Sequence, residues 1–244
     1  MKKRTALIGA LVSLMPIAQP LLIGSGAALT GAALILSLPE VANANRRAYF
    51  YFNRAFKKAE KGDDVGAIAD YTKAIELDPE DALAYYNRAI SKENLEDYSG
   101  AITDYTKAIK LDPKDADAFY GRALAKDNLE DYPGAIADNT KVIELDSEYL
   151  NAYINRGLAK SNLEDYSGAI ADYNKAIELD PEDALPYYNR GVVKGDLEDY
   201  SGAIADYNKA IELDSEYVNA YINRGIAKDD LNDYSGAIAD YNKA

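Results

Sequence analysis

The chain has 244 residues, of which 41 are Asp or Glu and 27 are Lys or Arg, giving a formal net charge of -14 at pH 7. Such an acidic surface repels phosphate backbones, so we expect no nucleic-acid partner. The absence of Cys and His removes thiolate nucleophiles, disulfides, imidazole bases and the usual zinc ligands, and we predict no metal and no cofactor.

Residues 1–44 differ in composition from the rest of the chain. Lys2, Lys3 and Arg4 precede an apolar run, and Ala42-Asn43-Ala44 fits the small-x-small pattern of signal peptidase sites. We predict a signal peptide cleaved after Ala44. The alternative is an N-terminal membrane anchor, because residues 21–38 are mostly apolar and nearly long enough to span a bilayer. Both readings predict export to the periplasm or another extracytoplasmic compartment.

The remaining residues, 45–244, are predicted to form one domain built from a 34-residue unit. Stretches such as EDYSGAIADYNKAIELD recur almost unchanged, and a fixed period of this length indicates stacked supersecondary units rather than one globular core. The six copies span about 48–81, 82–115, 116–149, 150–183, 184–217 and 218–244, the last being incomplete.

Each unit contains two apolar-periodic stretches, which predict two amphipathic helices. In the second copy these run from Ala82 to about Leu95 and from Tyr98 to about Leu111. An Asp precedes every second helix, where its side chain can cap the free N–H groups. Proline is expected to end the second helix in three copies. The capping residues are Asp63, Asp97, Asp131, Asp165, Asp199 and Asp233, and the prolines are Pro79, Pro113 and Pro181.

Small and aromatic residues recur at fixed places in both helices. In the second copy these are Tyr85 and Ala89 on the first helix, and Ala101 and Tyr105 on the second, followed by Pro113. Close helix packing requires the small residues, and the rings fill the space between contacts. This pattern resembles the tetratricopeptide repeat (TPR), and together with residues 1–44 it is similar to that of a bacterial TPR protein that is exported or membrane-anchored. The resemblance implies an all-α fold, a right-handed α-solenoid of antiparallel helix pairs.

An arginine stands in every copy where the family commonly has Leu. Six such arginines could form an anion-binding ladder, or each could pair with a recurrent Asp and serve the stacking of the repeats. We expect the second alternative, in which each Arg pairs with an Asp of the repeat. The arginines are Arg54, Arg88, Arg122, Arg156, Arg190 and Arg224, and the acids are Asp70, Asp104, Asp138, Asp172, Asp206 and Asp240.

The resemblance also implies that the concave face, lined by first helices, holds a peptide segment or a partner's helix. Its Asn side chains can donate and accept hydrogen bonds, and its Tyr, Ile and Leu side chains can form apolar pockets. No groove position supplies the cations needed to bind acidic tails, so we expect a neutral to basic, partly apolar protein partner. The candidate binding residues are Tyr86, Asn87, Ile90, Asn94, Tyr120, Leu124, Asn128, Asn151, Ile154, Asn155, Leu158, Asn162, Tyr188, Asn189, Val192, Ile222, Asn223 and Ile226.

We therefore predict a non-catalytic scaffold for protein–protein interaction that acts outside the cytoplasm. No nucleotide-binding, hydrolase or metalloprotease motif is present in the sequence. Two alternatives remain. The chain could self-associate as a structural protein through its incomplete, uncapped last repeat, or be the repeat portion of a longer enzyme or receptor.

Overall fold

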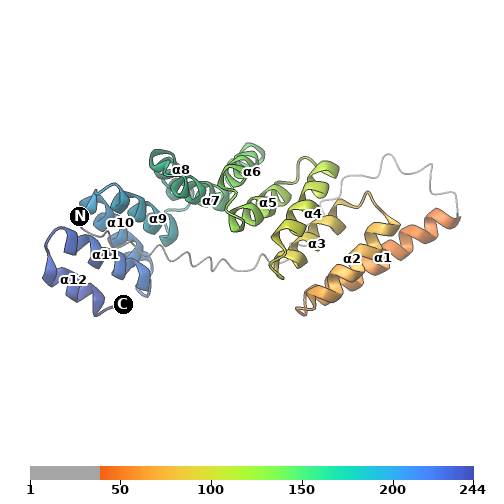
Figure 1. Ribbon diagram of the computed structural model, residues 1–244, viewed down its shortest axis with the longest axis horizontal. Coiled ribbons are helices and arrows are strands. Elements are labelled where there is room, and N and C mark those ends of the chain that lie inside the picture. The colour runs from red at the N-terminus through yellow and green to blue at the C-terminus, as the bar shows by residue number, and fades with distance from the viewer. Residues whose placement is uncertain (1–38) are drawn as a thin grey trace.

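The computed structural model describes residues 39–244, which form a row of helices with no strand among them (Figure 1). The predicted signal or anchor therefore lies outside the described residues, apart from positions 39–44 at the start of α1. The helices are α1 (Pro39–Ala59), α2 (Asp64–Leu77), α3 (Ala82–Glu93), α4 (Tyr98–Leu111), α5 (Ala116–Asn128), α6 (Tyr132–Leu145), α7 (Leu150–Asn162), α8 (Tyr166–Leu179), α9 (Ala184–Asp196), α10 (Tyr200–Leu213), α11 (Val218–Asp230) and α12 (Tyr234–Tyr241).

The predicted caps are confirmed at all six second helices. In α4, for example, the Asp97 carboxylate accepts a hydrogen bond from the Gly100 amide, and Asp63, Asp131, Asp165, Asp199 and Asp233 do the same in their copies. The short link before each cap needs a left-handed residue, which is Gly62 in the first copy. Later copies place Glu or Asn at this point with φ between 59° and 64°: Glu96, Glu130, Glu164, Glu198 and Asn232.

Each helix packs mainly against its neighbours along the chain. The two helices of a repeat lie antiparallel, and each second helix packs on the first helix of the next repeat. First helices of successive repeats also touch one another, from α1 and α3 through to α9 and α11, whereas second helices of the described repeats do not. The stack therefore curves with its first helices on the inner, concave side. This confirms the predicted all-α solenoid.

The core is a series of small clusters rather than one central core. In one cluster the Tyr105 ring packs beside Ala89 and Ala101, and in another the Tyr173 ring lies with Ala169 and Tyr153. No helix between Pro39 and Ala244 is both long and apolar enough to cross a bilayer.

The third copy differs from the others at two places in its helices, and at the first of these Gly121 stands where every other copy has Asn. Tyr105 lies so close to Gly121 that a Cβ added there would sit 2.5 Å from the ring. At the equivalent second-helix place in copy three, Asn139 replaces Tyr and is buried, with its side-chain amide bonded to the Ala135 carbonyl. Gly121 is thus explained by a ring from the preceding repeat.

Candidate functional site: the concave first-helix surface

The six repeated arginines are structural, as expected. Each guanidinium reaches the second helix of its own repeat and binds the recurrent Asp through two bonds. In copy four, Arg156 Nε and Nη2 lie 3.0 and 2.6 Å from the Asp172 carboxylate oxygens. A Lys four places after each Arg also binds the same carboxylate, as Lys160 does at 2.8 Å. These lysines are Lys58, Lys92, Lys126, Lys160, Lys194 and Lys228.

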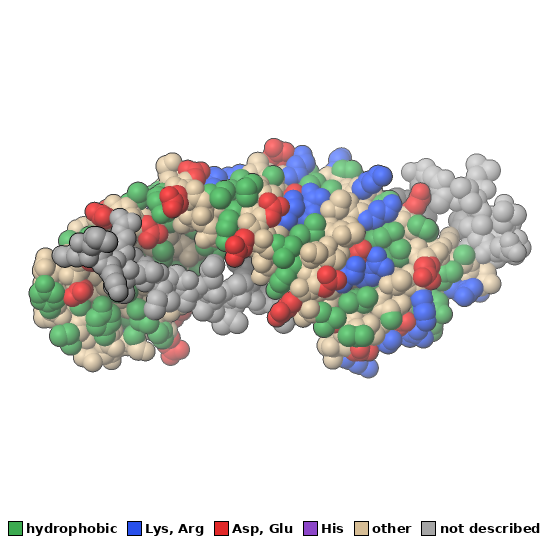
Figure 2. All heavy atoms as spheres, viewed as in Figure 1, with side chains coloured by type: hydrophobic (Ala, Val, Ile, Leu, Met, Phe, Trp, Pro, Cys, Tyr) green, Lys and Arg blue, Asp and Glu red, His purple; other side chains and the backbone are tan. Residues whose placement is uncertain are grey.

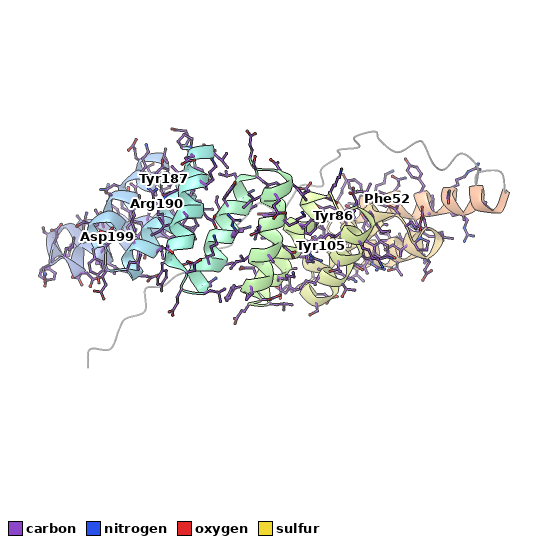
Figure 3. The ribbon with its side chains drawn as sticks, turned by 90° about the horizontal axis from the view of Figure 1, so that it is seen from above. Phe52, Tyr86, Tyr105, Tyr187, Arg190 and Asp199 are labelled. Atoms are coloured by element: carbon purple, nitrogen blue, oxygen red, sulfur yellow. The ribbon has the colours of Figure 1, made fainter. Side chains whose placement is uncertain are left out.

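The same guanidinium also joins consecutive repeats. From copy two onward its third nitrogen donates to a polar side chain on the preceding second helix, as Arg156 Nη1 does to Thr140 Oγ1 at 3.1 Å. The equivalent acceptors are Thr72, Thr106, Asn174 and Asn208. Each guanidinium carbon also lies 5.2 to 5.6 Å from the repeat's aromatic ring in these copies, as for Arg190 over Tyr187 (Figure 3).

In copies two to six this network leaves none of the repeated arginines free to bind an external anion, whereas the Arg54 side chain of the first copy remains 43% exposed. Each buried carboxylate is shared between its Arg and its Lys, and in copies two to six the flanking polar group and ring cover the rest of the guanidinium. In the first copy, hydrogen bonds from Arg54 outweigh burial and, with help from Lys58, lower the pKa of Asp70 to about 2. The lysine of the network and its inter-repeat acceptors were not predicted. Their recurrence at one place in each copy is the signal that could have identified them.

The predicted binding residues lie on the inner helices α3, α5, α7, α9 and α11, but their accessibility differs. The exposed ones are Asn94, Asn128, Asn151 and Asn162. Partly exposed are Tyr86, Asn87, Ile90, Tyr120, Leu124, Asn155, Leu158, Asn189, Val192, Ile222 and Ile226. Three are buried, namely Ile154, Tyr188 and Asn223. The side chains of these three are covered by neighbouring residues of the chain.

Two tyrosines that sequence reasoning missed explain part of this burial. Tyr149 and Tyr217 stand where three other first helices begin with a capping Asp, and neither makes a side-chain cap. Instead, Tyr217 packs 4.9 Å from the Tyr188 ring, and Asn223 donates to the Tyr188 hydroxyl at 3.0 Å. In the sequence, these two copies read Ser-Glu-Tyr where three other copies read Pro-Glu-Asp or Pro-Lys-Asp. This replacement of Asp by Tyr is the signal that could have identified the two packed tyrosines.

The second of these tyrosines, Tyr149, lies at the junction of α5 and α7. Tyr149 packs 5.1 Å from Tyr120, and its hydroxyl donates to Asp117 at 3.0 Å. Asn155 donates to the Tyr120 hydroxyl at 2.9 Å. Burial, opposed by that bond, raises the pKa of Tyr120 to about 12. Two predicted recognition residues, Tyr120 and Asn155, thus hold each other in place.

The side-chain amides of Asn87, Asn94 and Asn128 also donate hydrogen bonds within the protein. Asn87 and Asn128 donate to backbone carbonyls four residues earlier, at 2.8 and 2.9 Å. Asn94 donates to Asp64 at 3.1 Å. Because these donors are occupied, the amide oxygens are the groups that Asn87 and Asn128 can offer to a peptide backbone.

The inner surface of copies two to six carries carboxylates without matching cations. Glu93 and Asp127 on α3 and α5, and Asp196 at the end of α9, form no ion pair with a Lys or Arg of the described chain. Burial raises the pKa of each, and a bond from the Tyr105 hydroxyl partly opposes this at Glu93. Tyr86 packs beside Tyr105 at 5.8 Å in the same region (Figure 3). The groove is therefore aromatic and acidic near α3 and α5.

The described residues contain no cluster of three or more acidic side chains placed to hold a metal ion.

Stacked helical hairpins with an inner groove define the molecule as an α-solenoid of the helical-repeat class. A TPR repeat model matches residues 58–95, 94–126, 162–197 and 194–228, which is more than half of the chain, and a tetratricopeptide repeat model matches 218–244. The chain belongs to the tetratricopeptide repeat family.

Solved structures agree with this assignment. MamA protein is 25% identical, with a TM-score of 0.66 over 70% of this chain and 93% of its own. YrrB, described as a TPR protein with an unusual peptide-binding site, is 26% identical, with a TM-score of 0.65 over 74% and 94%. PilF of Pseudomonas aeruginosa, at 16% identity and a TM-score of 0.67 over 81% and 90%, shares the fold. A comparison with curated proteins gave no match.

Proposed function

We propose that this chain is a non-catalytic scaffold that binds a basic, partly apolar peptide segment along its first helices. The observation that carries the proposal is the pairing pattern of charges. Every repeated Lys and Arg of the network is bound to a buried Asp, whereas Glu93 and Asp127 in the groove have no cation partner in the described chain. A partly desolvated carboxylate is stabilised by an incoming cation, so Lys or Arg of a ligand complements this surface.

The apolar component comes from side chains beside these acids. Ile90, Leu124 and Leu158 lie one repeat apart on α3, α5 and α7 and are partly exposed. Apolar ligand side chains can cover them while the cations meet the acids. YrrB, a structure of similar fold and 26% identity, is described as having a peptide-binding site, which supports a peptide as the ligand of this chain.

The test is selection of peptides from a random display library by the full chain, followed by affinity measurement for the enriched peptides. We expect enrichment of Lys or Arg together with apolar residues, and binding that weakens as salt rises. Changing both Leu124 and Leu158 to Asp should abolish binding. Changing the exposed Ala137 and Ala171 on α6 and α8 to Asp adds the same charge to the outer helices and should leave binding intact. Enrichment of acidic peptides, or equal loss in both variants, contradicts the proposal.

We propose further that the repeats act outside the cytoplasm, because residues 1–44 have the charge and hydropathy pattern of an export signal or anchor. A phosphatase that is active only after export, fused after Ala244, tests this. We expect activity with the complete chain and none when residues 1–44 are deleted. A complete chain whose fusion protein accumulates without phosphatase activity contradicts export.

A further inference from the structure

The outward face of α1 differs from the equivalent face of every later first helix. In copies two to six, the third and tenth positions of the first helix hold Ala, Ser, Val or Pro and are buried, and Ala84 and Ala125 pack against the preceding repeat. The residues at these positions are Ala84, Ala118, Ala152, Pro186 and Ala220, and Ser91, Ala125, Ala159, Val193 and Ala227. In the first copy these places hold Phe50 and Lys57.

Bulky aromatic and cationic side chains continue across this face. Arg46, Tyr49, Phe50, Arg54 and Lys57 recur every three to four residues, line one shallow hollow on α1, and form what we call the basic end face. Tyr49 is 70% exposed and Phe50 57% exposed. The Arg54 side chain is 43% exposed, against 15% for Arg88 in the next copy. Arg46 and Lys57 have no ion pair with a carboxylate of residues 43–244.

The charge of this helix is opposite to that of the rest of the repeats. Residues 45–61 contain six basic residues and one acidic residue, whereas residues 62–244 contain 18 basic and 39 acidic. On the face shown in Figure 2, the blue Lys and Arg atoms gather over the end built by α1 to α4. The basic end face thus offers a strong positive field and exposed rings at one end of an otherwise acidic rod.

We propose that the basic end face rests on an anionic phospholipid membrane surface. Aromatic side chains flanked by Lys and Arg suit the boundary between headgroups and acyl chains, and each cation near such a surface strengthens association about fivefold. The face also lies on the helix that directly follows the apolar residues 21–38. This contact would be additional to any made by residues 1–44.

Two other occupants fit the face less well. Stacking of another repeat in the usual way requires small residues where Phe50 and Lys57 stand. Residues 1–38 contain no Asp or Glu, so they cannot neutralise Arg46, Arg54 and Lys57. An acidic surface of a second copy could do so, and the test below separates it from lipid.

The test places an environment-sensitive fluorophore on the face of the full chain. Because the chain has no native Cys, Asn53→Cys gives a single labelling site within the hollow. The labelled chain is reconstituted in vesicles of phosphatidylcholine alone, or with 30% phosphatidylglycerol, and quenching by neutral acrylamide is measured. A second label at Ser215→Cys, in the exposed link between α10 and α11, is the positional control.

We expect a blue shift and protection from acrylamide at position 53 only in anionic vesicles, with no change at position 215. Changing Arg46 and Lys57 to Gln should weaken the protected state about 25-fold, as two cations are lost. The matched control, Lys110→Gln with Lys114→Gln, removes two exposed cations at the end of α4 and should change nothing. Equal signals in both vesicle types, or no response to the Arg46 and Lys57 changes, overturns the proposal. Protection that rises with protein density in neutral vesicles identifies a second copy and also overturns it.

Discussion

The Asp172 carboxylate on α8 binds both Arg156 and Lys160 of α7, at 2.6 and 2.8 Å, while Arg156 also donates to Thr140 on the preceding repeat at 3.1 Å. One side chain therefore joins three helices from two repeats. Since a solenoid is stable only through contacts between neighbouring units, this network supports the surface that we propose binds a partner.

Arg156→Leu should lower stability far more than peptide affinity. It leaves the buried Asp172 with Lys160 alone and removes the bond to Thr140, so we expect a loss of about 3 kcal/mol, seen in urea unfolding. The double variant Arg156→Leu with Asp172→Leu also removes the buried carboxylate that has lost one of its two partners, and Lys160, which is 20% exposed, can turn to solvent. The double variant should be more stable than the single variant. Unchanged unfolding with lost peptide binding would restore the anion-ladder interpretation.

Gly121→Ala and Gly195→Ala form a matched pair of buried helical glycines. A Cβ at Gly121 would lie 2.5 Å from the Tyr105 ring, whereas at Gly195 the only atom within 4 Å is the Tyr207 hydroxyl at 3.9 Å. We expect Gly121→Ala to destabilise by about 1–3 kcal/mol through overpacking. Gly195→Ala should be neutral or stabilise by up to about 1 kcal/mol through helix propensity. Thermal unfolding of both variants measures this, and equal effects would contradict the packing around Tyr105.

Glu130 has φ of 59°, a left-handed conformation that suits glycine. Glu130→Gly should relieve strain and raise stability by about 0.5–1 kcal/mol after the entropy cost of glycine. The reverse control is Gly62→Ala in the first copy, where φ is 76° and no atom lies within 4 Å of an added Cβ. It should destabilise through backbone strain alone. A stabilising Gly62→Ala would show that this link is not left-handed.

Glu93→Gln should raise stability at pH 7 and have little effect at pH 3. Burial raises the pKa of Glu93, so the folded state holds this proton more tightly than the unfolded state. Stability is therefore lost as pH rises from the unfolded pKa through the folded one. The neutral amide escapes this loss and still accepts from the Tyr105 hydroxyl. Urea midpoints at both pH values measure the difference, with the exposed Glu182→Gln as control. A variant less stable than the native chain at pH 7 contradicts a desolvated Glu93.

The fold could be predicted because its determinants are local and repeated. The Asp97 cap and the packing of Ala89 with Tyr105 depend on spacing within one repeat, and six copies strengthen that signal. The Arg156 pairing was predictable for the same reason. The accessibility of the groove residues could not be predicted in this way. The burial of Tyr188, for example, depends on Tyr217 in the next repeat, a residue outside the periodic pattern. Contacts between unlike copies require coordinates.

Photo-cross-linking of a selected basic peptide to single-cysteine variants tests the proposed binding face most directly. The native chain has no Cys, so Asn128→Cys on α5 and Ala137→Cys on α6 place the same reagent on the inner and outer helix of one repeat. Both positions are exposed. We predict cross-linking from position 128 that an excess of unlabelled peptide abolishes, and none from position 137. Cross-linking from position 137 alone, or equally from both, would contradict a partner bound along the first helices.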